Sequence, residues 1–294
     1  MIGISIHRNE VTYLQLDKRK QNFSVSTHGK ISYKKYDEII TNAVKDIASL
    51  DDMNKEDKAI SFVVDSEFCL FNEVFCEDGD SLNFHQNLSG NNRIADYMDS
   101  YYYPINNRDD SYLGIHINKN IKSGLISSVE SSNYSLRSIG IGLFSAEMMA
   151  RSIFGAHALD NYLVIRFITS NLIEVLYIND GILMLYGKYK ISGNSVYLVK
   201  AIGNKKDSQT IISFLDHLRK ANRITTKEFN KVFIYQSSGN SPIIKKVIKN
   251  KNKNVVLLDL LSLNPENKLS QSTSEIFKNL KFAEHGQLFR GINV

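Results

Sequence analysis

The order of apolar and polar positions along the chain predicts strands and helices in two successive groups. In the first group, Ile2, Ile4 and Ile6 alternate with small or polar residues, and the alternation resumes after two polar turns up to residue 32. This pattern predicts three consecutive strands. The segment YDEIITNAVKDIASL carries apolar residues at helical spacing, and the runs KAISFVVD and EFCLFNEVF read as two further strands.

The middle of the chain begins with a polar stretch, DGDSLNFHQNLSGNN, which marks a subdomain boundary. A helix is predicted over residues 93–103, because a helix must end before Pro104. SYLGIHI (111–117) and KSGLISSV (122–129) read as strands, and SLRSIGIGLF reads as a third. Ser145 is then expected to cap a helix over SAEMMARSIFG.

The second group opens with YLVIRFITSNLIEVLYINDGILMLYGKYKI, residues 162–191, which reads as a β-hairpin. Asp180-Gly181 between alternating strands favours a tight turn with positive φ. A helix over SQTIISFLDHLRKA, the strand KVFIYQSSG, a helix opened by Ser241-Pro242, the strand VVLLDLL and a last helix follow. Strands therefore open both halves of the chain, and each is followed by helix and strand, a weak internal repeat that predicts two α/β lobes.

Composition narrows the class of protein. The 294 residues are 43% hydrophobic, enough for a core without crosslinks, and Cys69 and Cys76 form no disulfide framework or metal spacing, which favours a reducing compartment. No signal peptide or membrane-length apolar run is apparent, so we expect a cytoplasmic protein without direct membrane insertion. The net charge of +5 is scattered, and the basic run at 245–254 lacks aromatic interleaving, so no nucleic-acid partner is expected.

Several segments resemble one family, the type IV pilus assembly PilM family of the actin-like ATPase superfamily, which is related to the cytoplasmic domain of the type II secretion L protein. GISIHRNEVTYLQL is similar to the family's opening GIDIGTSSIKAVEL and keeps Gly3, Ile4, Ile6 and Leu16. The family's Asp, second Gly and Lys fall at Ser5, His7 and Thr12.

The resemblance continues to the end of the chain. In the hairpin, the family's Asp, Gly and Thr fall at Phe167, Thr169 and Ile173, and Gly193 matches a closing glycine. The family's adenosine-binding turn resembles YQSSGNSPII, where only Gly239 remains. The terminal FAEHGQLFRG is similar to YATALGLALRG and keeps Ala283, Gly286, Leu288, Arg290 and Gly291.

The resemblance implies an α/β, two-lobed actin-like (ribonuclease H-like duplicated) fold with a small inserted subdomain in the first lobe. The first lobe would span residues 1–158, with the insertion at about 78–140. The second lobe would span 159–294, with a shortened insertion at about 194–227.

The chemistry that a nucleotide needs is degenerate at these positions. Phosphates need closely approaching backbone N–H groups, which glycines permit, and Mg²⁺ needs a carboxylate. His7 and Arg8 are bulky, Ser5 removes the carboxylate, and Phe167 and Ile173 are apolar. We therefore expect a pseudo-ATPase, with no catalytic residues, no metal and no cofactor; ATP with Mg²⁺ is conceivable but not expected.

Other residue types point to no alternative chemistry. The seven histidines show no HxxxH or HExxH spacing, and no GxSxG or GxxxxGK[ST] motif occurs. Arg166 reads as an outward strand residue, with a position near a phosphate as the alternative, and Asp65 reads as an ordinary strand-edge charge.

The resemblance implies a scaffold that binds the short cytoplasmic tail of an inner-membrane assembly protein, at the inner face of the inner membrane. The expected site is a groove between the first lobe and its insertion, with Tyr101 and Tyr103 as candidate anchors. Three alternatives stay open: an active ATPase or kinase of the same superfold, a filament-forming cytoskeletal protein, and a regulator that binds an anion through His7 and Arg8. A homo-oligomer is also open.

Overall fold

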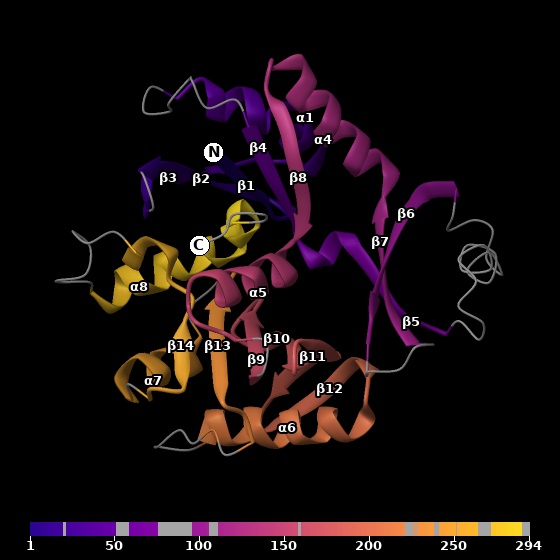
Figure 1. Cartoon of the computed structure of the whole chain (residues 1–294), viewed down its shortest axis with the longest axis vertical. Helices are drawn as coiled ribbons and strands as arrows, with labels where there is room; N and C mark the ends of the chain where they lie inside the picture. The colour runs from indigo at the N-terminus through magenta and orange to yellow at the C-terminus, as the bar shows by residue number, and fades with distance from the viewer. Residues whose placement is uncertain are drawn as a thin grey trace.

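The strands of the described part of the chain form three sheets (Figure 1). The computed structural model describes residues 1–19, 22–50, 59–75, 96–105, 111–157, 160–220, 226, 228–237, 241–250, 252–263 and 272–289. Within these residues, no helix is both long and apolar enough to cross a bilayer.

The first sheet has the order β3-β2-β1-β4-β8. Its strands are β1 (Ile2–Ile6), β2 (Glu10–Arg19), β3 (Asn22–Ser32), β4 (Ala59–Val64) and β8 (Ser135–Ile141). Helices α1 (Tyr36–Ala48) and α4 (Lys119–Ser131) cover one face, where the apolar stripe of each helix joins Ile2, Ile4 and Ile6 in one core. All five residues of β1 are buried, which shows that its other face is covered as well.

The second sheet has the order β12-β11-β10-β9-β13-β14. Its strands are β9 (Asn161–Phe167), β10 (Leu172–Asn179), β11 (Ile182–Ser192), β12 (Ser195–Gly203), β13 (Lys231–Gln236) and β14 (Val255–Leu257). Helices α6 (Lys205–Lys220) and α7 (Pro242–Asn250) pack on one face through a shared core. Asp180 and Gly181 have φ values of 50° and 76°, so the predicted turn between β10 and β11 is confirmed.

The two sheets repeat one topology, apart from the extra edge strand β12. In each sheet the first strand pairs antiparallel with the second, the second pairs antiparallel with the third, and the first pairs parallel with the next strand of the sheet (β1 with β4, β9 with β13). The prediction that the strands opening each half lie in separate, duplicated sheets is confirmed.

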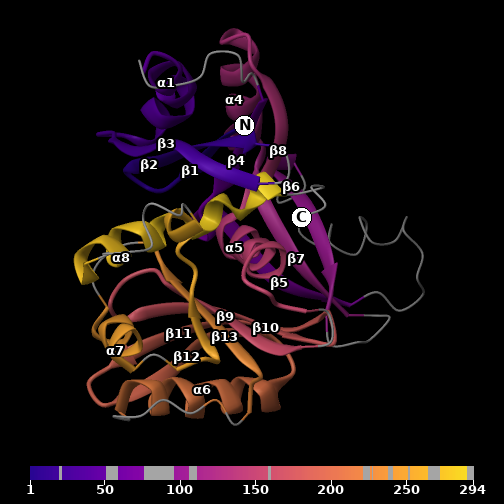
Figure 2. The same ribbon diagram turned by 60° about the vertical axis from the view of Figure 1, so that its left-hand side comes forward.

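Two segments lie between the sheets, as Figures 1 and 2 show from two directions. They are α5 (Gly142–Ser152), which follows β8, and the 3-10 segment η5 (Leu280–Phe289), which follows α8 (Thr273–Asn279). Each segment contacts both sheets: α5 contacts β9 and β10 of the second sheet and β4 and β8 of the first, and η5 contacts β1, β2 and β4 of the first sheet and β13 of the second. The central core is therefore built by both halves of the chain.

The third sheet, ordered β5-β7-β6, lies at the side of the molecule. It consists of β5 (Cys69–Phe75), β6 (Met98–Pro104) and β7 (Ser111–Asn118), and the short turn η1 (Ser66–Phe68) precedes it. Strand β8, although it falls within the predicted insertion, joins the first sheet. A second short 3-10 segment, η3 (Leu260–Leu263), follows β14.

Four predicted elements are wrong. Residues 98–103, expected in a helix, form strand β6, because β7 offers a pairing edge and the tyrosines suit a half-buried sheet surface. KSGLISSV, expected as a strand, lies in helix α4, where Leu125 and Val129 are four residues apart on the buried face. Ser145 does not cap α5, which already begins at Gly142, and the last predicted helix continues as the 3-10 segment η5.

Candidate functional site

A buried arginine joins the two lobes where β4, β9, β10 and η5 meet. Arg166, on β9, is 0% exposed. Its guanidinium forms ion pairs with Asp65, which directly follows β4, with Glu174 on β10 at 3.0 Å and with Glu284 on η5 at 3.1 Å. One cation therefore holds carboxylates from three separate parts of the chain.

Hydroxyl groups complete the environment of the two glutamates. Ser66 donates to Glu174 at 2.7 Å and accepts from Nη1 of Arg166 at 2.7 Å. Tyr186 donates to Glu174 at 3.0 Å. Glu284 accepts from Ser5 at 3.0 Å, from Tyr235 at 3.2 Å and from Ser237 at 3.3 Å. This buried set, which we call the interlobe network, consists of Ser5, His7, Asp65, Ser66, Arg166, Glu174, Tyr186, Tyr235, Ser237 and Glu284.

The charges in the network shift one another's pKa values. Burial by itself would raise the pKa of Asp65, but the charge of Arg166 and the hydrogen bond from His7 outweigh it and hold that pKa well below its usual range. Burial likewise opposes the charge on Arg166, yet Asp65 and Glu284 keep the guanidinium pKa well above its ordinary value. Since buried charges persist only when paired, these directions describe a network of fixed charges.

The pKa values of two histidines, His7 in the network and His285 beside it, are shifted in opposite directions. His7 lies 3.0 Å from Asp65 and 3.9 Å from Glu284. Burial would lower its pKa, but the hydrogen bond to Asp65 and the charge of Glu284 raise it above the ordinary value. His285 contacts the hydroxyl of Thr12 at 3.2 Å. Burial, with a contribution from the positive charge of His7, lowers the pKa of His285 to about 3.

The degenerate positions of the first predicted loop lie at this network. Ser5 and His7 belong to it, and Thr12 contacts His285 beside it. A Cβ on Gly3 would lie only 2.6 Å from Nδ1 of His285. The glycine at this position therefore permits the close approach of η5 to β1.

The predicted positions of the second loop lie elsewhere. Phe167 and Ile173 are buried in the core under α6 and α7. Thr169 is exposed in the turn between β9 and β10, and Gly193, with a φ of 54°, lies in the turn between β11 and β12. Gly239 lies outside the described residues. The structure therefore pairs Phe167 with Ile173 across β9 and β10, next to the turn that holds Thr169, whereas Gly193 lies in a different turn.

The interpretation of Arg166 as an outward residue and of Asp65 as an ordinary edge charge is wrong. Arg166 and Glu174 are direct partners across the β9–β10 pair, one position from Phe167 and Ile173. Because successive side chains of a strand point to opposite faces, the apolar pair faces the helices and the charged pair faces the other lobe. In the sequence, the signal of this pair is a single charge inside each of two otherwise apolar strands.

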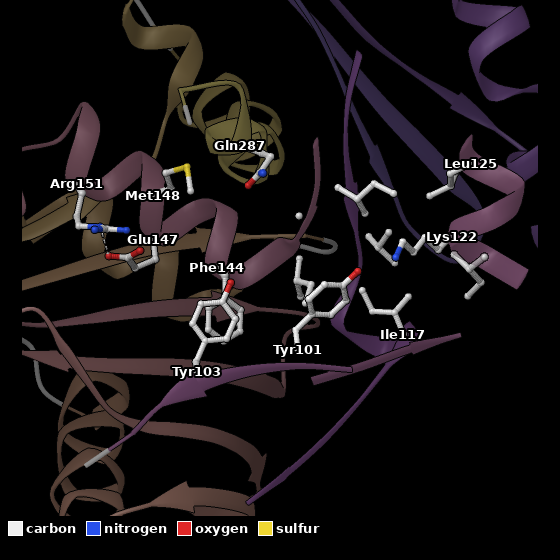
Figure 3. A pocket seen from close by; sticks show the side chains of 15 residues that line it. Tyr101, Tyr103, Ile117, Lys122, Leu125, Phe144, Glu147, Met148, Arg151 and Gln287 are labelled. Atoms are coloured by element: carbon white, nitrogen blue, oxygen red, sulfur yellow. Dashed lines mark ion pairs between the residues drawn. The ribbon is translucent and has the colours of Figure 1, made fainter. Parts of the chain in front are cut away.

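A pocket of about 270 Å³ lies on the first-lobe side of α5, between β6, α4 and the end of β4 (Figure 3). Apolar side chains supply most of its wall, and Lys122, Glu147, Arg151 and Gln287 supply polar groups. Tyr101 and Tyr103, the two predicted anchors, point into it from β6. They are 41% and 45% exposed.

Local contacts fix the polar groups of the pocket. Tyr103 stacks on Phe144 of α5 with ring centroids 5.2 Å apart. Lys122 pairs with Asp99 at 2.7 Å and lies 5.7 Å from the centre of the Tyr101 ring. At the other end, Glu147 accepts from Tyr162 at 2.7 Å and pairs with Arg151 at 2.7 Å. The pocket thus combines an apolar wall with one ion pair at each end.

The duplicated sheets, the third sheet beside them and the crossing of α5 and η5 define an actin-like fold. In agreement, a solved PilM–PilN type IV pilus biogenesis complex matches 100% of this chain and 98% of that chain, with a TM-score of 0.59 and 8% identity. The cytoplasmic domain of EpsL, an inner membrane component of the Vibrio cholerae type II secretion system, matches with a TM-score of 0.46 and 9% identity over 95% of this chain and 96% of that chain.

Another solved structure that is similar to this chain is an enzyme. The polyphosphate/ATP-glucomannokinase from Arthrobacter sp. strain KM matches with a TM-score of 0.44 and 11% identity over 98% of each chain. No protein-family model matches the sequence, and no curated protein matches it. At 8% identity, the likeness to the PilM–PilN complex shows a common fold alone.

Proposed function

We propose that this protein is a scaffold that docks a short, extended segment of an inner-membrane assembly protein in the pocket between α4, α5 and β6. The observation that carries the proposal is the pocket itself, which has an apolar wall and two exposed tyrosines at its rim. Buried aromatic anchors contribute much of the energy in peptide interfaces.

The neighbouring strand adds a second means of attachment. Among the described residues, strand β6 pairs with β7 alone and forms an edge of the third sheet. An edge strand offers free N–H and C=O groups with which an incoming extended chain can pair. A peptide alongside β6 would therefore place alternate side chains into the pocket, next to Tyr101 and Tyr103.

We further propose that the scaffold works as a pseudo-ATPase, without hydrolysing ATP. The interlobe network supports this role, because Arg166, Asp65 and Glu284 occupy the region between the lobes with side chains that satisfy one another. A phosphate group approaching Ser5 and His7 would meet two carboxylates, Asp65 and Glu284. The partner would recruit the protein to the inner face of the inner membrane.

Site-specific photo-crosslinking in the native cell tests the docking site. A photoreactive amino acid at Tyr101 should crosslink to one inner-membrane protein, and mass spectrometry should map the adduct to a short cytoplasmic segment. The same amino acid at Tyr97, which is 67% exposed and does not line the pocket, serves as the control.

A synthetic peptide of the mapped segment should then bind the purified protein in calorimetry. Equal crosslinking from both positions, or a peptide that does not bind, would contradict the proposed docking site. Pelleting of the purified protein as polymers would instead support the filament-forming alternative.

A further inference from the structure

The interlobe network and the pocket share two pieces of the chain. Val64, the last residue of β4, lines the pocket, and Asp65, the next residue, binds Arg166. In η5, Gln287 lines the pocket and Glu284 binds Arg166. Each shared segment therefore presents one side chain to the pocket and one to the network.

The local geometry of these segments makes the two side chains move together. Along an extended strand, neighbouring side chains point to opposite faces, so Val64 and Asp65 lie on either side of one backbone. In a 3-10 helix, residues three apart lie one above the other, which places Glu284 and Gln287 on the same side of η5. A shift of either carboxylate is thus transmitted over a single residue or a single turn.

Close packing against α5 leaves η5 little freedom to absorb such a shift. A Cβ on Gly142 would lie 2.8 Å from the Glu284 carboxyl group, and a Cβ on Gly140 would lie 2.6 Å from Oε1 of Gln287. Gly286 lies so close to α5 that a Cβ there would overlap the carbonyl oxygen of Ser145. Segments packed this closely respond as rigid units.

We propose that Arg166 is a positioning residue for the pocket: by holding Asp65 and Glu284 together, it keeps the pocket walls formed without any ligand between the lobes. This inference rests on the proposed function of the pocket as the docking site. Without the guanidinium, the buried carboxylates of Asp65, Glu174 and Glu284 repel one another. The end of β4 and η5 then separate, and the pocket loses two of its walls.

Hydrogen exchange of the free protein tests the coupling without any partner. In Arg166→Gln, we expect exchange to accelerate at least tenfold in the end of β4 and in η5, and also in the pocket walls of α4 and α5. Helix α6, on the far face of the second sheet, should keep its wild-type rate. Arg219→Gln is the matched control, because Arg219 also forms an ion pair, with Asp216 at 3.4 Å, but lies on α6.

Two results would overturn the inference. One is faster exchange that stops at the network and leaves the pocket walls unchanged. The other is an equal acceleration of every element, α6 included, because this would mean that Arg166 supports only global stability. Should Arg166→Gln fail to fold, Glu284→Gln, which keeps the shape of the side chain and removes its charge, is judged by the same criteria.

Binding of the mapped peptide supplies the second measurement and separates the two proposals. We expect Arg166→Gln to weaken peptide binding at least tenfold, Arg166→Lys to restore part of the affinity, and Arg219→Gln to leave it unchanged. By linkage, the peptide should slow exchange at Asp65 and Glu284 in the wild-type protein. If no peptide binds the pocket, the proposed docking function is wrong, and hydrogen exchange still tests the coupling between the interlobe network and the pocket. If Arg166→Gln binds the peptide with wild-type affinity, the coupling is wrong and the docking function stands.

Discussion

Arg166 and Glu174 face each other across the β9–β10 pair, fully buried, with Nη1 3.0 Å from Oε2. This contact belongs to the second lobe alone, but the same guanidinium also binds Asp65 behind β4 and Glu284 on η5. The Arg166–Glu174 pair therefore holds the guanidinium in the position in which it also binds the other two carboxylates.

Removing the buried cation should cost much of the stability of the fold. Arg166→Met keeps most of the side-chain volume but removes the guanidinium that Asp65, Glu174 and Glu284 share. His7 and Lys188 would remain as the cationic partners of these carboxylates. Breaking a buried ion pair on one side costs about 3–5 kcal/mol, and we expect a loss of at least this size in urea unfolding at pH 7. Arg219→Met, which removes a more exposed pair, should cost about 1 kcal/mol or less. Similar losses in the two variants would contradict the central role of Arg166.

Stability should fall as the pH is lowered below 6.5, in part because of His285. Its pKa is about 3 in the folded protein and about 6.5 when unfolded. Between these values the unfolded state binds the extra proton, so the free energy of unfolding decreases toward acid, by about 1.4 kcal/mol per pH unit. His285→Gln should reduce this slope by about 1.4 kcal/mol per pH unit, which corresponds to the one proton that His285 binds on unfolding. Urea unfolding at pH 6.5, 5.5 and 4.5 measures the slope at pH values above the range in which Asp65 titrates. An unchanged slope in His285→Gln would contradict the lowered pKa of His285.

The stability contributed by His7 should show the opposite sign. Its pKa is raised in the folded protein, so the proton is held more tightly there than in the unfolded chain. The stabilisation is complete below the unfolded pKa of about 6.5 and is lost as the pH rises through the folded pKa. His7→Asn should therefore lose less stability than the wild type when the pH is raised above 6.5. Nuclear magnetic resonance titration of the His7 ring provides a direct check, and a pKa below 6.5 would refute the prediction.

The packing of η5 on α5 should not tolerate a methyl group at Gly286. A Cβ there would lie 2.8 Å from the backbone nitrogen of Met149 and would overlap Ser145. Overpacking of this kind costs about 1–3 kcal/mol, so Gly286→Ala should lower the melting temperature by several degrees. Lys281→Ala, on the same segment, removes only a partly exposed pair with Glu10 at 3.4 Å and is the control. A melting temperature equal to that of the control would show that η5 can shift freely.

We expect no ATPase activity and no ATP affinity tighter than about 1 mM, which corresponds to about −4 kcal/mol. The reason is that Asp65 and Glu284 are held by Arg166 and His7 instead of being free to coordinate Mg²⁺. Calorimetry with ATP and Mg²⁺ measures the affinity, and phosphate release measures turnover. A micromolar dissociation constant would favour the active ATPase or kinase alternative.

Partner binding should depend on the tyrosines that point into the pocket. Tyr101→Ala should weaken binding of the mapped peptide by about 2 kcal/mol, because the ring supplies apolar area at the pocket rim. Folding should be largely retained, since the side chain is 41% exposed. Tyr97→Ala, which changes a more exposed ring outside the pocket lining, should leave the affinity unchanged. Equal affinities of the two variants would place the docking site elsewhere.

Much of the fold could be predicted because its elements carry their own periodicity. Alternation in β1, helical spacing in α1 and the Asp180-Gly181 turn each depend on nearby residues and on one buried face. The repeated order of these elements then predicts two lobes. The prediction failed at β6 and α4, where the local sequence is compatible with either structure and the pairing with β7 or packing on α1 decides.

The candidate site was predicted only in part, because its residues meet through the tertiary structure. The sequence predicted that the first loop lacks phosphate-binding chemistry, which stays a prediction, and it selected Tyr101 and Tyr103, which the structure places at a pocket. It could not show that the side chains of Asp65 and Glu284 both contact Arg166, because the three residues lie far apart along the chain.

Pattern alone determines which face of a strand is apolar, since that depends on neighbours two residues away. Whether a lone charge such as Arg166 faces water or a counter-charge depends on what the other lobe brings to it. Burying that charge is unfavourable without its partners and acceptable with them. Only the folded chain, with β4, β10 and η5 in place around β9, decides between these two outcomes.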